Sequence, residues 1–242
     1  MKNAAKIRHA EPFRRFFILL LVIIILSIGA SGCMKKRDIP EEMVQYMRDK
    51  YNEEFTLVAK DTQTWMSNYR MMTVEPAAFP GKFVEVWRNK QTGEITDSYL
   101  PLKVNADVEK EISAVTSEVY GENKVFNLAS TVPDSAFALP DMPASDFLRL
   151  ASGITCARIW VTKDPADKDR DVEAFRQALQ DKGYYLTFYI IYIEKGAFSS
   201  LNEESGDKYY SNYVHGSAPP VTMAGYFLID ESPGFYSAEW YD

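Results

Sequence analysis

Few residues in this 242-residue chain are able to do chemistry. Beyond residue 33 there is one histidine, His215 in the stretch NYVHGSAPP, and one further cysteine, Cys156. Zinc sites use several His or Cys ligands, so these counts argue against one. No nucleophile motif such as G-x-S-x-G lies near His215, although a Ser/His/Asp triad assembled in space stays an open alternative. We therefore name no catalytic residue, no metal ligand and no cofactor.

Alternating acids lie near the start of one predicted helix. Asp167, Asp169 and Asp171 have the spacing of the first ligands of an EF-hand calcium loop. The pattern fails at its sixth position, which is Val172 instead of Gly, and at its twelfth, which is Ala178 instead of Glu. We expect these acids to complement the positive N-terminal end of the following helix instead.

The strongest candidate for a binding surface is the connection at residues 195–220, which we interpret as a long loop without secondary structure. Loops of about 26 residues are uncommon in compact domains and are usually functional or disordered. Its candidate binding residues are Tyr209, Tyr210, Tyr213 and His215, whose amphipathic rings suit sugar, peptide or protein surfaces. The alternative is that the tyrosines fold back and cover the end of a sheet.

The elements that position these residues alternate between helices and strands. In the first half, 39–130, we expect a helix from near Asp38, strands at 54–60 and 64–74, a hairpin within 82–104 that turns at 89–93, a helix at 105–121 with Asn105 as its N-cap, and a strand at 124–130. The Pro-rich segment 131–145 is interpreted as a connection.

The second half, 146–242, is predicted to contain a helix at 146–152, a strand at 155–162, a helix at 164–183 that Asp164 caps, a strand at 184–194 and a hairpin of 221–230 with 234–241. The strand at 184–194 is apolar on both faces and is expected in the middle of a sheet, parallel to 155–162. The order predicts an α+β fold with helices on a mostly antiparallel sheet, in one domain or two subdomains.

The N-terminus reads as an export signal. Five basic residues precede an apolar run at 16–28 that is too short for a full membrane span. Because no charge occurs from Phe16 through Met34, a retained anchor is the alternative. Both interpretations export the rest of the chain.

Ala30-Ser31-Gly32-Cys33 resembles the lipobox of bacterial lipoproteins, with Ala30 where that family prefers Leu. The resemblance implies cleavage after residue 32, a diacylglyceryl group on the Cys33 sulfur, fatty acylation such as palmitate, and an extracytoplasmic position on the cell membrane. Residues 33–38 would then form a leash, and the lipid bilayer would be one partner. With Cys33 lipidated, Cys156 has no disulfide partner.

The net charge limits which other partners the protein can bind. Removing residues 1–32 lowers the basic count from 27 to 22 and the acidic count from 34 to 33, so the exported body carries −11. This balance argues against nucleic acid. The segment with Lys50, Tyr51, Glu53, Glu54 and Phe55 resembles small uncharacterised lipoproteins of Gram-positive bacteria. We expect a non-enzymatic module that binds a protein, peptide or envelope component; the alternatives are an accessory subunit of a membrane complex and an envelope hydrolase.

Overall fold

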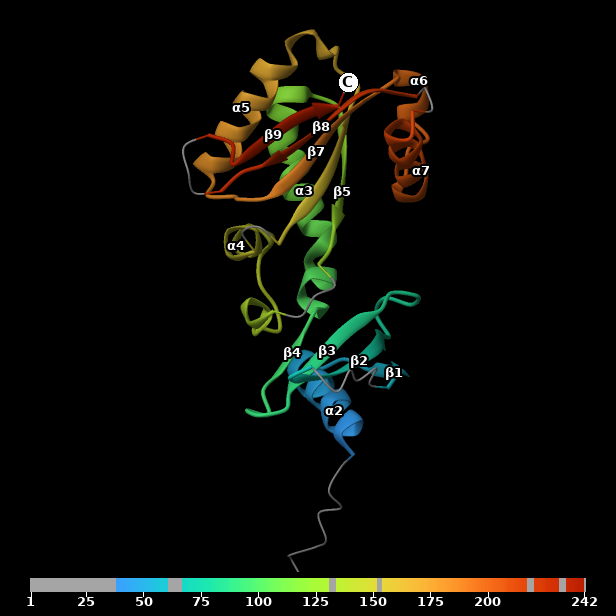
Figure 1. Cartoon of the computed structure of the whole chain (residues 1–242), viewed down its shortest axis with the longest axis vertical. Helices are drawn as coiled ribbons and strands as arrows, with labels where there is room; N and C mark the ends of the chain where they lie inside the picture. The colour runs from blue at the N-terminus through green and yellow to red at the C-terminus, as the bar shows by residue number, and fades with distance from the viewer. Residues whose placement is uncertain are drawn as a thin grey trace, which may run out of the picture. The chain divides into compact units, whose positions relative to one another are not determined.

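The computed structural model describes residues 38–60, 67–130, 134–151, 154–216, 220–230 and 234–241 (Figure 1). The chain divides into two units, Met1–Glu42 and Met43–Asp242. The export signal and Cys33 lie outside the described residues, so their assignment stays a prediction. In the described ranges, no helix combines the length and apolarity that a membrane span requires.

The predicted α+β class is confirmed, with two sheets. The first sheet has four antiparallel strands in the order β1-β2-β3-β4, namely β1 (Phe55–Ala59), β2 (Tyr69–Pro76), β3 (Val84–Asn89) and β4 (Ile95–Asp97). Its hairpin between β3 and β4 turns where predicted, at Asn89 to Gly93, and Gly93 takes the positive φ of 77° that this turn needs. The second sheet has the order β5-β6-β7-β8-β9, with β5 (Asn123–Leu128), β6 (Cys156–Val161), β7 (Thr187–Ile193), β8 (Val221–Leu228) and β9 (Ser237–Tyr241).

The second sheet confirms two predictions about strand placement. β7 lies in the middle of the sheet, and β6 and β7 form its parallel pair, with the remaining pairs antiparallel. β5 pairs with β6, so this one sheet contains strands from both predicted halves. The domain boundaries themselves stay predictions.

Six α-helices occur in the described ranges: α2 (Ile39–Tyr51), α3 (Tyr99–Tyr120), α4 (Ala144–Leu150), α5 (Lys168–Asp181), α6 (Lys195–Phe198) and α7 (Glu203–Val214). Two short 3-10 helices are η1 (Ser135–Phe137) and η2 (Pro165–Asp167). Asp164 caps η2 at the start of the predicted helix, because its carboxylate accepts from the backbone N–H of Ala166 at 2.9 Å.

The start of α3 corrects one expectation. We predicted strand through residue 104 and a helix that Asn105 caps, but the helix already begins at Tyr99 after Ser98. Pro101 falls in the first turn, where a missing N–H costs nothing. Asn105 lies inside the helix and donates its amide to Glu109 instead. Gly121 ends the helix with a φ of 72°, as predicted.

The main core lies between α3, α5 and one face of the five-stranded sheet (Figure 1). Val108, Ile112 and Val115 of α3 are fully buried there, as are Phe175 of α5 and Phe188 of β7. Gly225 of β8 leaves room for the Trp240 ring of the neighbouring strand, because a Cβ there would lie 2.5 Å from that ring. A second core lies on the opposite face of the same sheet, under α6 and α7.

Candidate functional site

Residues 203–214 form a helix, which corrects the interpretation of 195–220 as a loop. Asn202 accepts from the backbone N–H of Ser205, and the Ser205 hydroxyl accepts from the backbone N–H of Asn202, which completes a capping box. Glu203 and Glu204 add negative charge to the first turn of α7. The candidate tyrosines are therefore held on a rigid element.

Three of the four candidate residues lie on one stripe of α7. Gly206, Tyr209, Tyr210 and Tyr213 are spaced i, i+3, i+4 and i+7, and this stripe packs on the sheet. Gly206 makes the approach close, since a Cβ there would lie 3.3 Å from the buried Trp160 ring. The predicted alternative, that the tyrosines cover the sheet, describes this arrangement.

Tyr210 makes the most specific contacts of the stripe. Its ring meets the Tyr189 ring of β7 edge to face, with centroids 5.4 Å apart, and the Arg158 guanidinium of β6 lies 5.3 Å from its centroid. Arg158 also pairs with Asp207 one turn earlier in α7. Burial raises the pKa of Tyr210 above its usual value. These contacts hold α7 on the sheet by an aromatic pair, a cation–π contact and an ion pair.

Near the end of α7, Tyr213 contacts the sheet and His215 is exposed. The Tyr213 hydroxyl donates to the Tyr241 carbonyl of β9 at 2.8 Å. His215 is exposed at the C-cap, and its Nδ1 lies 2.7 Å from the Ser211 carbonyl. The structure thus groups the three tyrosines on the sheet and leaves the histidine outside that group.

Sequence reasoning missed the sheet residues that lie under and beside α7. The strand register places outward side chains in three rows across all five strands. The covered row lies under α6 and α7 and comprises Lys124, Trp160, Ile191, Ala224 and Tyr241. The middle row comprises Phe126, Arg158, Tyr189, Tyr226 and Glu239, and the end row comprises Leu128, Cys156, Thr187, Leu228 and Ser237.

The middle and end rows together, which we name the sheet patch, keep contact with solvent. Glu239 is exposed and every other member is half-buried, whereas Trp160, Ile191 and Ala224 of the covered row are fully buried. Tyr189 and Tyr226 lie side by side, with ring centroids 5.2 Å apart. Burial raises the pKa of the Cys156 thiol, which favours its protonated form.

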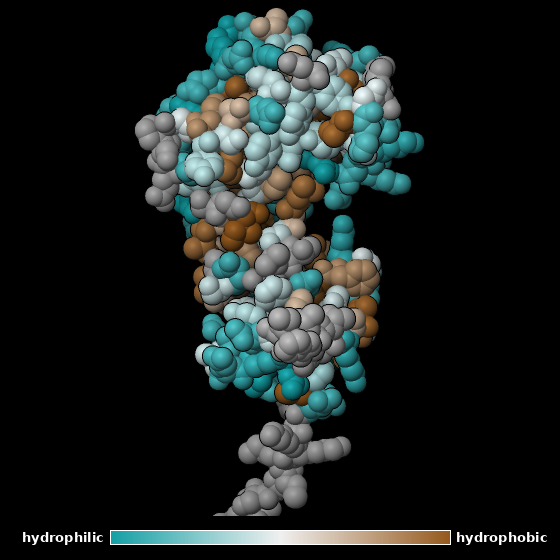
Figure 2. Space-filling view, in the orientation of Figure 1, coloured by the Kyte–Doolittle hydropathy of each residue, from teal (hydrophilic) through white to brown (hydrophobic). Residues whose placement is uncertain are grey.

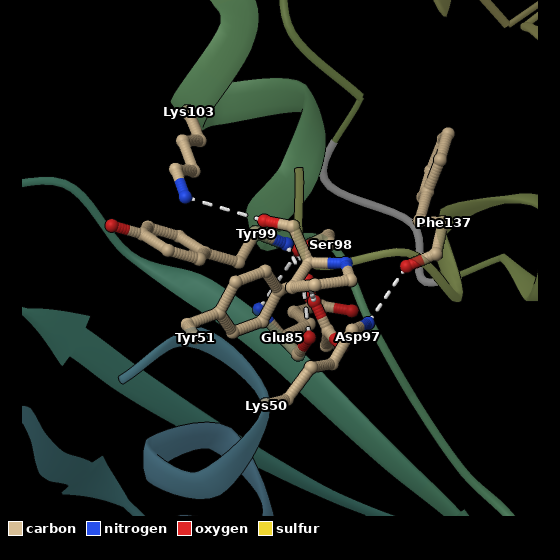
Figure 3. Close-up of polar contacts among 9 residues, drawn as sticks. Lys50, Tyr51, Glu85, Asp97, Ser98, Tyr99, Lys103 and Phe137 are labelled. Carbon is tan, nitrogen blue, oxygen red and sulfur yellow. Dashed lines mark hydrogen bonds and ion pairs between the residues drawn. The ribbon is translucent and has the colours of Figure 1, made fainter. Parts of the chain in front are cut away.

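A second polar cluster surrounds Asp97 at the end of β4 (Figure 3). The Asp97 carboxylate lies 2.7 Å from the Lys50 ammonium of α2, accepts from the Tyr51 hydroxyl at 2.6 Å, and accepts from the Tyr99 backbone N–H at 3.0 Å. Lys50 also donates to the Phe137 carbonyl of η1 at 2.7 Å. Burial and the Asp97 charge raise the pKa of Tyr51.

The Asp97 cluster joins elements and presents no reacting group. The Asp97 side chain has 0% exposure and that of Lys50 has 8%. Each oxygen of the carboxylate has a donor, so the charge is compensated where it is buried. The cluster fixes α2, β4, the start of α3 and η1 to one another, and we assign it a structural role.

The acids that resemble part of a calcium loop have different partners in the structure. Asp169 and Asp171 occupy the first turn of α5, as predicted. Asp171 pairs with Lys163 at 2.6 Å, and Asp169 accepts from the Trp240 indole at 2.8 Å. Within the described ranges, no group of three or more His, Cys, Asp or Glu side chains is placed to hold a metal ion.

Comparisons with known proteins add little. No family model matches the sequence, and no curated protein matches it either. Among solved structures, the chain is similar to a DUF5037 family protein from Ruminococcus gnavus, at 14% identity over 67% of this chain and 78% of that chain. The TM-score is 0.36.

Proposed function

We propose that the chain is a lipid-anchored extracytoplasmic protein that binds a protein, peptide or envelope component through the sheet patch. Cys33 would carry the anchor, and residues 33–38 would tether the folded body to the membrane. The support for the anchor is the sequence pattern around Cys33 alone.

The observation that carries the binding role is the half-exposed state of the sheet patch. Tyrosines and one arginine next to small apolar side chains are the composition that recognition surfaces favour, because such side chains combine apolar contact with hydrogen bonding. Tyr189 and Tyr226 provide adjacent rings, and Leu128 and Leu228 provide apolar contact in the neighbouring row. α7 fixes Arg158 and Tyr189 in place from one side. The patch is therefore preorganised for a partner.

Photocrosslinking in intact cells tests this function. A photoreactive residue at position 187 or 226, both in the sheet patch, should crosslink the same partner. The same residue at position 204, on the exposed side of α7, should not. Equal crosslinking from all three positions, or none from 187 and 226, would overturn the proposed binding face.

A further inference from the structure

The four-stranded sheet has an outward face of one charge sign. Burial alternates along the strands, and the strand register aligns the less buried positions. The side chains opposite the core therefore share one face. Each of them is exposed or half-buried: Thr56, Ala59, Tyr69, Met71, Thr73, Glu75, Glu85, Trp87, Asn89 and Thr96. Two are acidic and none is Lys or Arg.

An aromatic pair lies beside one of these acids. The Tyr69 and Trp87 rings have centroids 5.6 Å apart. The Trp87 indole N–H donates to the Glu85 carboxylate at 3.0 Å, and the Gly81 N–H donates to the Glu75 carboxylate at 2.7 Å. Among the residues that the structure describes, neither glutamate forms an ion pair. The face thus holds two oriented carboxylates that form no ion pair with a cation of the described ranges.

We propose that this face binds an extended basic segment of a partner protein, with Lys or Arg side chains at alternate positions. A carboxylate attracts a cation directly, and the face of an indole or phenol ring attracts it through the ring quadrupole. The net charge of −11 on residues 33–242 also favours a positively charged partner.

The spacing of the groups sets the pattern of the partner. Glu85 and Trp87 are two residues apart on β3, so their side chains leave the same face about 7 Å apart. Side chains on one side of an extended peptide repeat at that same interval. One basic side chain then pairs with Glu85 while the next lies over the Tyr69 and Trp87 rings. This surface belongs to a different sheet from the sheet patch, so either proposal can fail without the other.

The test uses the full-length protein in nanodiscs of zwitterionic lipid and a fluorescent peptide of alternating lysine and serine. Binding is followed by anisotropy, with a glutamate–serine peptide as the reference probe. Glu85→Gln should weaken lysine-peptide binding about fivefold at low salt, the Coulomb effect of one charge at about 4 Å in water. Replacing Tyr69 by Ser should weaken it about two- to fivefold, the size of an exposed cation–π contact.

Matched variants elsewhere separate this site from overall charge. Glu204→Gln removes the same charge from the exposed side of α7, and Tyr236→Ser removes an aromatic ring that is 71% exposed outside this face. Both should leave the affinity unchanged within about twofold, because neither residue lies on this face and salt screens the long-range effect of an exposed charge. Equal weakening by Glu85→Gln and Glu204→Gln, or equal binding of the two peptides to the wild type, would overturn the proposal.

Discussion

Replacing Tyr210 by Ala should destabilise the protein. The change removes an edge-to-face contact with Tyr189, worth about 0.5–1.5 kcal/mol, and a cation–π contact with Arg158, worth about 0.5–1 kcal/mol. It also exposes apolar surface that the half-buried ring covers, worth about 1–2 kcal/mol. The free energy of unfolding should therefore fall by about 2–4 kcal/mol, well above the roughly 0.5 kcal/mol typical of an exposed side chain.

Urea denaturation of residues 38–242, followed by circular dichroism, measures this loss. The midpoint should fall at an unchanged m-value, and the melting temperature should fall by about 4–16 °C. His215→Ala is the matched control, because it removes an exposed aromatic residue from the end of the same helix and should change the unfolding free energy by less than about 0.5 kcal/mol. If Tyr210→Ala and His215→Ala lower stability equally little, the docking of α7 on the sheet is wrong.

Three other predictions concern buried charge and the anchor. Asp97→Ala should lower the free energy of unfolding in urea by about 3–5 kcal/mol, because it leaves Lys50 charged and buried. The double variant with Lys50→Met should lose less stability than the two single variants together. Additive losses would contradict the ion pair. Burial raises the pKa of Glu109 from 4.5, so its folded state holds the proton more tightly and stability should fall as pH rises from about 4.5 through the raised pKa. Glu109→Gln should flatten that part of the pH–stability curve, and an unchanged slope would assign it to another group. Cys33→Ala should abolish metabolic labelling with a fatty-acid probe and release the protein from the membrane fraction, whereas normal labelling would contradict the lipoprotein interpretation.

The elements with strong local signals were predictable. The run from 184 to 194 is apolar at odd and even positions, and this pattern predicted the central place of β7. Both faces of the strand are buried from residue 190 to residue 193. Asp164 with Pro165 marked the beginning of the helical segment, since Asp is a favoured N-cap and Pro fits the first helical turn. The parallel pair of β6 and β7 followed from the helix that joins them.

Local signals were ambiguous where composition and context conflict. α7 is rich in Tyr, Ser, Gly and Asn, which favour loops, and the capping pair of Asn202 and Ser205 was the signal that would have identified the helix. The beginning of α3 reads YLPLKV, a short apolar run whose period fits either a strand or a buried helix.

Long-range contacts left no signal in one sequence. Lys50 and Asp97 are 47 positions apart, so their pairing depends on the packing of α2 against β4 and not on local spacing. The sheet patch likewise exists only once five strands are in register, because its rows combine one residue from each strand. Arg158, a charge within an otherwise apolar strand, was a local indication that the outward face differs from the core face.

The affinity of the crosslinked partner for a patch variant tests the proposed function most directly. Thr187→Lys places a charged side chain in the middle of the end row without removing a packed ring. Glu204→Lys adds a lysine on the exposed side of α7 as the control. The sheet patch predicts that Thr187→Lys weakens binding at least about tenfold, or about 1.4 kcal/mol, at an unchanged melting temperature, while Glu204→Lys stays within about twofold of wild type. Equal affinities for the two variants would contradict the proposed function.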